Sequence, residues 1–182
     1  DERLPRAEIL DCLGRIADKS LVQIERAGDR SRYRLLETIR QLARERLAEA
    51  GEADAFDAAH CRHFLRLAVD SDPDRAAGIV AERPQALDID HDNLRAALGW
   101  ALRHDPGRAL LLGVSLWRFW LARGHFVEGA GWLERILAVA PPESPERSPA
   151  LFALAILEAR RGLSDRLPSL GAAALASSER SG

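Results

Sequence analysis

The segment that decides the fold of this chain begins with Ala17-Asp18-Lys19-Ser20-Leu21-Val22 and resumes, after a short polar stretch, with Tyr33-Arg34-Leu35-Leu36-Glu37-Thr38-Ile39-Arg40-Gln41-Leu42-Ala43-Arg44-Glu45-Arg46-Leu47. Just upstream, from Ala7 to Ala17, apolar residues recur every three or four positions, as in an amphipathic helix. Over 21–26 and near 33–35 apolar and polar residues alternate, which predicts two strands. From Glu37 the helical spacing returns. The segment therefore predicts a helix, a hairpin and a second helix.

Glycines mark the ends of these elements. The polar stretch 27–31 contains Gly28, which can take the positive φ that a hairpin loop needs. Gly51 stands where a left-handed C-terminal cap ends a helix. Helix, hairpin and helix form the second half of a winged helix. We therefore expect residues 1–51 to be the C-terminal part of a winged-helix domain.

The remainder of the chain predicts helix after helix. A helix over 53–69 is ended by Ser71-Asp72-Pro73-Asp74, because proline disfavours helix at the residue before it and lacks a backbone donor. Pro84 marks a further interruption or helix start. Asp92 and Asn93 cap or lead into a helix over 94–102, and Asp105-Pro106-Gly107 predicts a turn. We assign 52–105 to a linking helical segment.

Two helices around Gly124 form the clearest repeat unit. They are predicted over 108–122 and 126–140, and Pro141-Pro142 ends the second. Gly129 lies five residues after Gly124 and Leu133 four residues later, the order of small and large residues in a degenerate tetratricopeptide-type hairpin. The small residue would let the two helices approach, and the large one would fill the groove to the next pair. Trp117, where that repeat prefers glycine, departs from the pattern.

A second helical pair is expected over 151–161 and 170–177, with a turn at Gly162. Gly124 and Gly162 are 38 residues apart, more than the about 34 residues of a standard tetratricopeptide repeat. Pro168 and Gly171 weaken the prediction of the last helix. The predicted fold is mainly α: a partial winged helix with one β-hairpin, followed by degenerate TPR-like helical repeats over 106–182.

Composition restricts the function classes. The 182 residues carry a formal net charge of −2, which argues against general attraction to nucleic acids or membranes. No apolar run approaches the about 20 residues that span a bilayer, and the first residues do not form a secretion signal. We therefore expect a cytoplasmic protein whose two cysteines are free thiols.

The opening segment resembles the end of the winged-helix domain in bacterial STAND-class ATPase regulators, which include many LuxR-type and SARP-type transcription factors. The run Asp92-Asn93-Leu94-Arg95-Ala96-Ala97-Leu98-Gly99-Trp100-Ala101-Leu102 resembles the same family, just ahead of its repeats. The resemblance implies that this chain is the middle of a larger regulator and not an enzyme. It also implies that the chain holds no cofactor, because ATP or ADP would bind only in an absent upstream domain.

Two motifs imitate catalytic or binding sites. Gly14-Arg15-Ile16-Ala17-Asp18-Lys19-Ser20 ends like a phosphate-binding loop, but Asp18 replaces a required glycine and places a negative charge beside the phosphate. The segment also leads from helix to strand, the reverse of the required order. In His60-Cys61-Arg62-His63, the two histidines supply at most two of the about four ligands of a zinc site. We therefore predict no catalytic, cofactor-binding or metal site.

The hairpin offers candidate DNA contacts at Arg26, Arg30, Arg32 and Arg34. In DNA-binding winged helices the helix before the hairpin enters the major groove, and the wing touches phosphate or the minor groove. Here that helix carries Glu8 and Asp11, which phosphates would repel. The resemblance likewise implies a packing and nucleotide-state-relay role for this winged helix. Direct DNA binding is therefore not the favoured interpretation.

Three tryptophans, Trp117, Trp120 and Trp132, are candidates for a partner groove between stacked helices. Tryptophan is favoured at interfaces, and it also contributes much buried area to cores. Core packing is favoured, because large aromatic residues in helical hairpins are usually structural. The groove stays an alternative.

The favoured function is a non-catalytic regulatory and interaction module that relays the binding of a protein partner, a neighbouring protomer or a small effector to an ATPase domain. One alternative is a DNA-binding winged-helix module, and another is a stand-alone helical adaptor. The sequence contains no credible site for a metal-dependent or hydrolytic enzyme.

Overall fold

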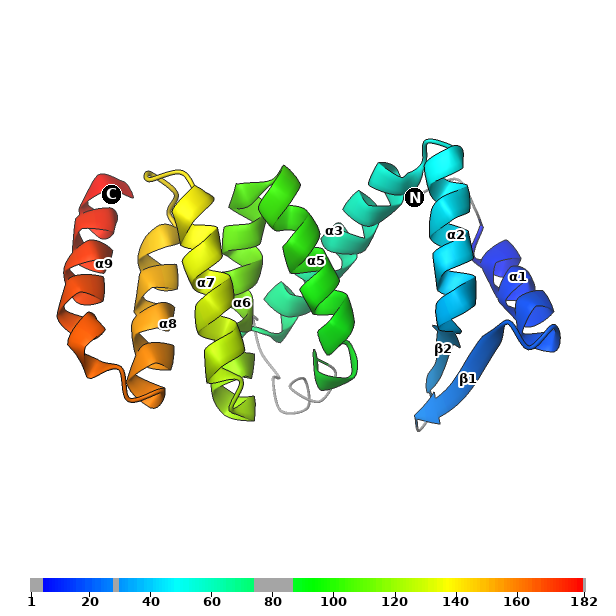
Figure 1. Ribbon diagram of the computed structural model, residues 1–182, viewed down its shortest axis with the longest axis horizontal. Helices are drawn as coiled ribbons and strands as arrows, with labels where there is room; N and C mark the ends of the chain where they lie inside the picture. Colours follow the sequence, from blue (N-terminus) through cyan, green and yellow to red (C-terminus); the bar gives the residue numbers. More distant parts are fainter. Residues whose placement is uncertain (1–4, 28–29, 74–86, 182) are drawn as a thin grey trace. The chain divides into compact units, whose positions relative to one another are not determined.

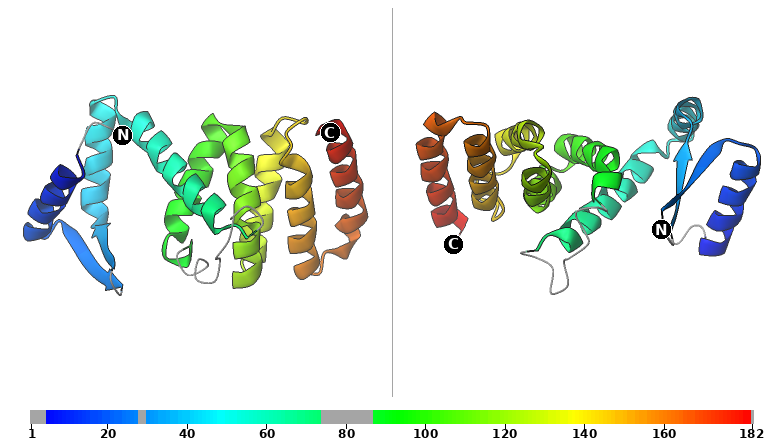
Figure 2. Two further views of the ribbon diagram at one scale, coloured as in Figure 1. Left: turned by 180° about the vertical axis from the view of Figure 1, so that it is seen from behind. Right: turned by 90° about the horizontal axis from the view of Figure 1, so that it is seen from below.

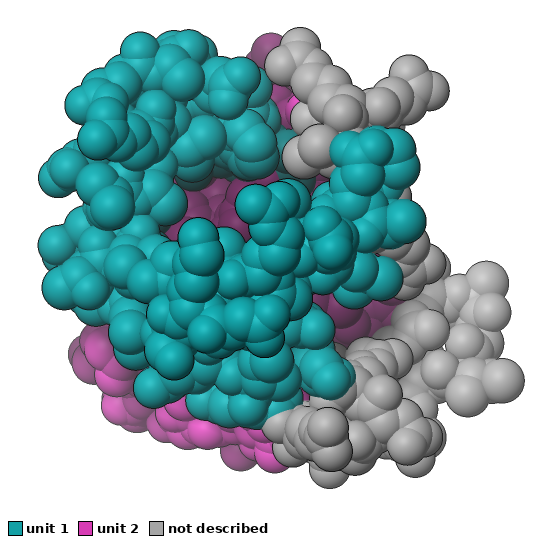
Figure 3. Space-filling view, turned by 90° about the vertical axis from the view of Figure 1, so that its right-hand side faces the viewer, with its two compact units in different colours: residues 1–59 teal, residues 60–182 magenta. Residues whose placement is uncertain are grey.

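The computed structural model describes residues 5–27, 30–73 and 87–181 of the chain. It divides into two compact units, Asp1–Ala59 and His60–Gly182, here called the N-terminal and the C-terminal unit (Figure 3). The division falls within one helix, α3 (Ala53–Ser71). The domain boundaries predicted at residues 51 and 105 stay predictions.

The N-terminal unit consists of α1 (Arg6–Asp18), β1 (Val22–Ala27), β2 (Arg30–Leu35), α2 (Glu37–Glu49) and the start of α3 (Figure 1). The two strands pair antiparallel, with Val22 opposite Leu35 and Ile24 opposite Tyr33. Within the described residues this hairpin is the only sheet, and all other regular elements are helical. The prediction of a mainly α fold with one β-hairpin is confirmed.

The register of the hairpin gives it one apolar face. Residues that pair directly across a hairpin lie on the same face, so Val22, Ile24, Tyr33 and Leu35 share one face, here called the hairpin face. Of these only Val22 is buried, at 6% exposure, whereas Ile24 is 50% exposed. Helix α2 buries no residue. The described part of the N-terminal unit thus has almost no core of its own.

The C-terminal unit continues from α3 through a series of helices (Figures 1 and 2). They are α5 (His91–His104), α6 (Pro106–Arg123), α7 (Phe126–Val139), α8 (Arg147–Arg160), the short 3₁₀ helix η1 (Ser164–Arg166) and α9 (Leu167–Ser181). From α5 to α8 each helix packs against the next, α8 packs against α9, and α6 also packs against α8. The helices therefore form a layered stack.

A side-chain cap explains where helix α6 starts. The side chain of Asp105 accepts a hydrogen bond of 3.0 Å from the backbone N–H of Arg108, and Pro106 occupies the first turn, where it needs no donor. Helix α6 therefore begins two residues before the predicted start. Helix α5 begins at His91 with Asp90 before it, so neither Asp92 nor Asn93 is the cap. Pro84 lies outside the described residues.

The turns predicted at Gly51, Gly124 and Gly162 are confirmed by positive φ values, whereas Gly28 of the predicted hairpin loop lies outside the described residues. Gly51, Gly124 and Gly162 have φ of 69°, 74° and 80°, a region that residues with a Cβ rarely occupy. The doubt about the last helix was wrong. Pro168 lies in the first turn of α9, where a missing backbone donor costs little, and the helix runs on through Gly171 to Ser181.

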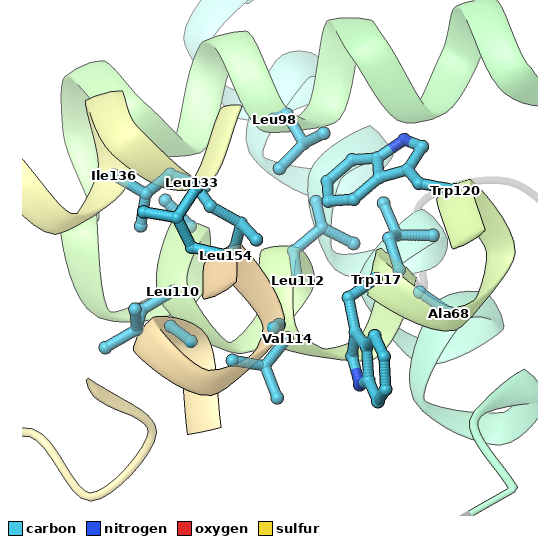
Figure 4. Close-up of a cluster of buried hydrophobic side chains, with 14 of the residues drawn as sticks. Ala68, Leu98, Leu110, Leu112, Val114, Trp117, Trp120, Leu133, Ile136 and Leu154 are labelled. Atoms are coloured by element: carbon cyan, nitrogen blue, oxygen red, sulfur yellow. The ribbon is translucent and has the colours of Figure 1, made fainter. Parts of the chain in front are cut away.

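One buried cluster holds the C-terminal unit together (Figure 4). Its largest fully buried side chain is Trp120 of α6, which is 1% exposed. A Cβ built on Gly129 of α7 would lie 2.8 Å from the Trp120 ring and 2.8 Å from Cδ1 of Leu157 on α8. Gly129 therefore lets α7 approach both neighbours, as the sequence predicted for this small residue. The assignment of these helices to TPR-type repeats stays a prediction.

Replacing Gly129 with alanine is expected to lower the free energy of unfolding by about 1 to 3 kcal/mol, because the new methyl group overpacks the core. Gly131, on the same helix, has no atom within 4 Å of an added Cβ. Gly131→Ala is therefore the matched control, and its better helix propensity should raise stability by up to about 1 kcal/mol. Urea denaturation measures both. Equal effects of the two substitutions would contradict the close approach at Gly129.

Candidate functional site

The four arginines predicted to contact DNA do not share one face of the hairpin. By register, Arg26 falls on the hairpin face. The other three, Arg30, Arg32 and Arg34, fall on the opposite face. Arg32 stands directly across from Glu25, so the two opposite charges are cross-strand neighbours. Arg34 is exposed, and the side chains of Arg26 and Arg30 lie outside the described part. On α1, Glu8 and Asp11 are exposed, so acidic groups accompany the basic ones.

The three candidate tryptophans lie in different surroundings. Trp117 is 9% exposed and has Arg118 at 4.6 Å from its ring centroid and Phe152 of α8 at 6.1 Å. Trp120 lies within the core (Figure 4). Trp132 is half-buried, with the Arg135 guanidinium 3.8 Å from its ring centroid. The structure therefore does not gather the three rings at one groove, and their role in partner binding stays a prediction.

Near Trp117, the described residues leave a large aromatic side chain uncovered. Phe152 is 56% exposed and meets the Trp117 ring edge-on, with an interplanar angle of 84°. Since α6 packs directly against α8, these two rings form a small aromatic patch shared by the two helices. The sequence pattern did not single out Phe152, because one apolar residue in a regular helical stripe gives no sign of exposure.

The two imitation motifs have ordinary structural environments. Lys19 and Ser20 follow the end of α1, and Ser20 has φ of 57° in the connection to β1. On α3, the rings of His60 and His63 both pack against Phe64, at centroid distances of 4.6 Å and 4.9 Å. Burial raises the pKa of the Cys61 thiol, so this cysteine is a poor nucleophile. Across the described ranges, no three His, Cys, Asp or Glu side chains converge as a metal site would require.

A polar cluster joins α5 to α7, and sequence reasoning missed it. Arg95 donates two hydrogen bonds of 2.7 Å to the two carboxylate oxygens of Glu128, 33 residues away. This bidentate contact is the main cause that lowers the pKa of Glu128. His91 lies beside it, with Nε2 at 3.2 Å from Glu128 Oε1. Only the helix packing brings these residues together, so no local spacing in the sequence could indicate the cluster.

A second charged cluster lies at the end of α8. The side chain of Glu158 is fully buried, with Oε1 at 2.5 Å from Nη1 of Arg161 and Oε2 at 3.4 Å from Nη1 of Arg166. Arg166 also reaches Glu134 of α7 at 2.6 Å. These contacts connect α7, α8 and η1, and they suit structural support more than catalysis.

Among the described residues, no helix is both long and apolar enough to cross a bilayer.

Similar proteins occur in mycobacteria. The chain is 39% identical over 136 residues to proteins of Mycobacterium bovis and of two strains of Mycobacterium tuberculosis, each named "Putative HTH-type transcriptional regulator". The alignment covers 71% of this chain and 14% of each relative, so the chain spans about one seventh of their length. No family model matches the chain. No solved structure matches it. The similarity supports a transcription-regulator family for this chain. The match covers one segment of each of these relatives.

Proposed function

We propose that this chain is a non-catalytic regulatory and interaction module of a transcriptional regulator. The observation that carries the proposal is the 39% identity over 136 residues to proteins named as HTH-type transcriptional regulators. Within the proposal, the regulator is of the STAND class with LuxR-type or SARP-type relatives, and it acts in the cytoplasm. The module relays effector or partner binding to an ATPase domain that holds ATP or ADP.

The exposed hairpin face supports the relay role. Ile24, Tyr33 and Leu35 are 50%, 39% and 40% exposed, and a two-stranded hairpin alone is at best marginally stable in water. A face of this kind gains stability when another apolar surface covers it. The hairpin face is therefore the surface through which the module would contact the rest of the regulator.

The helical stack supports the partner-binding role. Helices stacked in a row present a long lateral surface, which stacked helical proteins use to bind other molecules. The exposed Phe152 beside Trp117 offers an aromatic anchor for a protein partner, a neighbouring protomer or a small effector. Arg95 and Glu128, whose pKa values are both shifted, form an ion pair between two helices, and such a structural use agrees with a non-catalytic role.

The test compares two neighbouring residues on opposite faces of β1, in a full-length regulator that contains this chain. Ile24→Asp places a carboxylate on the hairpin face and should reduce the effector-dependent change in reporter transcription at least about tenfold, because a buried unpaired charge costs more than the 1.4 kcal/mol of a tenfold effect. Gln23→Asp places the same side chain on the opposite face and should leave the response unchanged. ATP hydrolysis by the regulator is measured in parallel.

Equal responses of the two variants would refute a relay through the hairpin face. A second measurement separates the DNA-binding alternative: the 182-residue chain is titrated with duplex DNA at low salt. Affinity that falls with salt and is lost in Arg34→Glu would favour DNA binding by the wing. The proposed relay predicts no such binding.

A further inference from the structure

Two histidines meet where α5, α7 and the turn between α6 and α7 come together. The rings of His91 and His125 have centroids 4.7 Å apart, and the Phe119 ring is nearly perpendicular to that of His91, with centroids 5.2 Å apart. Glu128 and Arg95 complete the cluster, which we call the histidine junction: His91, His125, Glu128 and Arg95. Its members come from two helices and a turn, so they contact each other only while α5 and α7 are packed.

His91 is poorly placed to carry a proton. Its side chain is 15% exposed, and Nε2 approaches Glu128 Oε1 to 3.2 Å. At that distance Nε2 still makes no hydrogen bond to any described residue. Both oxygens of Glu128 already accept hydrogen bonds of 2.7 Å from Arg95. The negative charge that would stabilise an imidazolium is therefore already paired with a guanidinium.

The charged groups around His91 oppose one another. Glu128 on α7 attracts a proton to His91, whereas Arg95 on the same helix and His125 in the turn repel it. Helix α6 contributes Phe119, an apolar ring, and its last residue, Arg123, pairs with Asp88. Burial is the largest effect, and it lowers the pKa of His91 below the ordinary histidine value of 6.5.

We propose that the histidine junction is a proton-sensitive contact, which holds α5 against α7 when His91 is neutral and loosens when His91 takes up a proton. An imidazolium at this place would lie beside the His125 ring and the Arg95 guanidinium, with little access to water. Separation of α5 from α7 at this contact exposes the imidazolium to water.

The direction of the pH effect follows from linkage. The folded state holds a proton on His91 less tightly than the unfolded state, so between the two pKa values the unfolded chain binds more protons. The contribution of the junction to stability is therefore complete above the unfolded pKa of about 6.5. It is lost as the pH falls below that value and through the folded pKa of His91.

Unfolding of the 182-residue chain in urea, followed by tryptophan fluorescence at pH values from 8 to 5, tests the proposal. All four tryptophans lie in the C-terminal unit, so their fluorescence reports on the helices that the junction joins. If the pKa of His91 is one unit lower in the folded chain than in the unfolded chain, the equilibrium constant for unfolding should rise about tenfold as the pH falls, and each further unit should add another such factor. His91→Phe keeps a ring beside Phe119 but cannot titrate, so it should flatten this dependence. His63→Gln, at an exposed position on α3, is the matched control and should keep it.

NMR titration of the histidine side chains in the unmutated chain makes the test independent of how well the variant folds. The proposal expects His91 to titrate below 6.5, with changes in the amide signals of α5 and α7 over the same pH range. In His125→Gln the midpoint of His91 should rise, because a repelling neighbour is removed. A midpoint of His91 at or above the ordinary value would overturn the proposal, as would an unchanged pH dependence in a folded His91→Phe variant.

Discussion

Replacing Trp120 with alanine is expected to lower the free energy of unfolding of the chain by about 3 to 5 kcal/mol, the range for removing a buried aromatic side chain. Trp120 is 1% exposed. Its ring fills the space above Gly129, and it shares a core with Leu98 of α5, Leu112 of α6 and Leu133 of α7 (Figure 4). The truncation therefore opens a cavity at the meeting point of successive helices, which cannot close while the rest of the stack keeps its spacing.

Urea denaturation followed by circular dichroism at 222 nm measures this loss without depending on the fluorescence of the removed ring. Phe152→Ala is the matched control, because it also deletes a large aromatic ring, but one that is 56% exposed. We expect its cost to stay below about 1 kcal/mol, as for most surface substitutions. A similar loss in both variants would mean that Trp120 does not lie at the centre of the core.

Local signals in the sequence predicted the elements of the fold well. The change of apolar spacing around Val22 and Glu37 marked the hairpin and the helix after it, because strand and helix place side chains on one face with different periods. Gly51, Gly124 and Gly162 marked helix ends, because the left-handed cap strongly favours a residue without a Cβ. Pro168 misled the prediction, since a proline ends a helix when it lies in the interior but fits the first turn.

Contacts between distant residues could not be predicted in the same way. The spacing of Gly129 indicated a close approach, but not that Trp120 and Leu157 would be the two side chains against it. Arg95 and Glu128 are 33 residues apart, and each looked like an ordinary solvated charge. Pairing of this kind depends on which helix faces meet, and the period of one helix does not contain that information.

The candidate functional residues show the same distinction. The sequence identified the arginines of the hairpin, and the register of the two strands then placed Arg32 and Arg34 on one face. Exposure was not predictable: Ile24 has the pattern of a core residue and is 50% exposed. An apolar residue on a regular face is expected to be covered, so only the structure shows that the described residues leave the hairpin face open.

Replacing Arg161 with methionine is expected to lower the free energy of unfolding by about 3 kcal/mol, because it leaves a buried carboxylate without its main partner. The Glu158 side chain is 0% exposed, and Arg161 is its closest cation, at 2.5 Å. Arg166 lies farther away, at 3.4 Å, and it is also engaged with Glu134. Methionine keeps the length and apolar stem of arginine, so the loss would report the charge and not the packing. Arg160→Met, at the exposed neighbouring position, controls for the substitution and should change stability by less than about 0.5 kcal/mol.

A second substitution distinguishes the effect of a buried unpaired charge from the effect of a lost packing contact. Adding Glu158→Gln to Arg161→Met removes the buried negative charge. The double variant should therefore recover at least half of the free energy of unfolding that Arg161→Met loses. Each single change alone also removes the ion pair, so the two effects should not add. Arg166 would not be stranded in turn, because it keeps its contact of 2.6 Å with Glu134. Chemical denaturation of the four proteins of this cycle gives the coupling energy directly. If the double variant is instead less stable than Arg161→Met, the carboxylate is not a buried charge that needs neutralising. Glu158 would then stabilise the contact between α8 and η1 through Arg166, which lies 3.4 Å from its carboxylate.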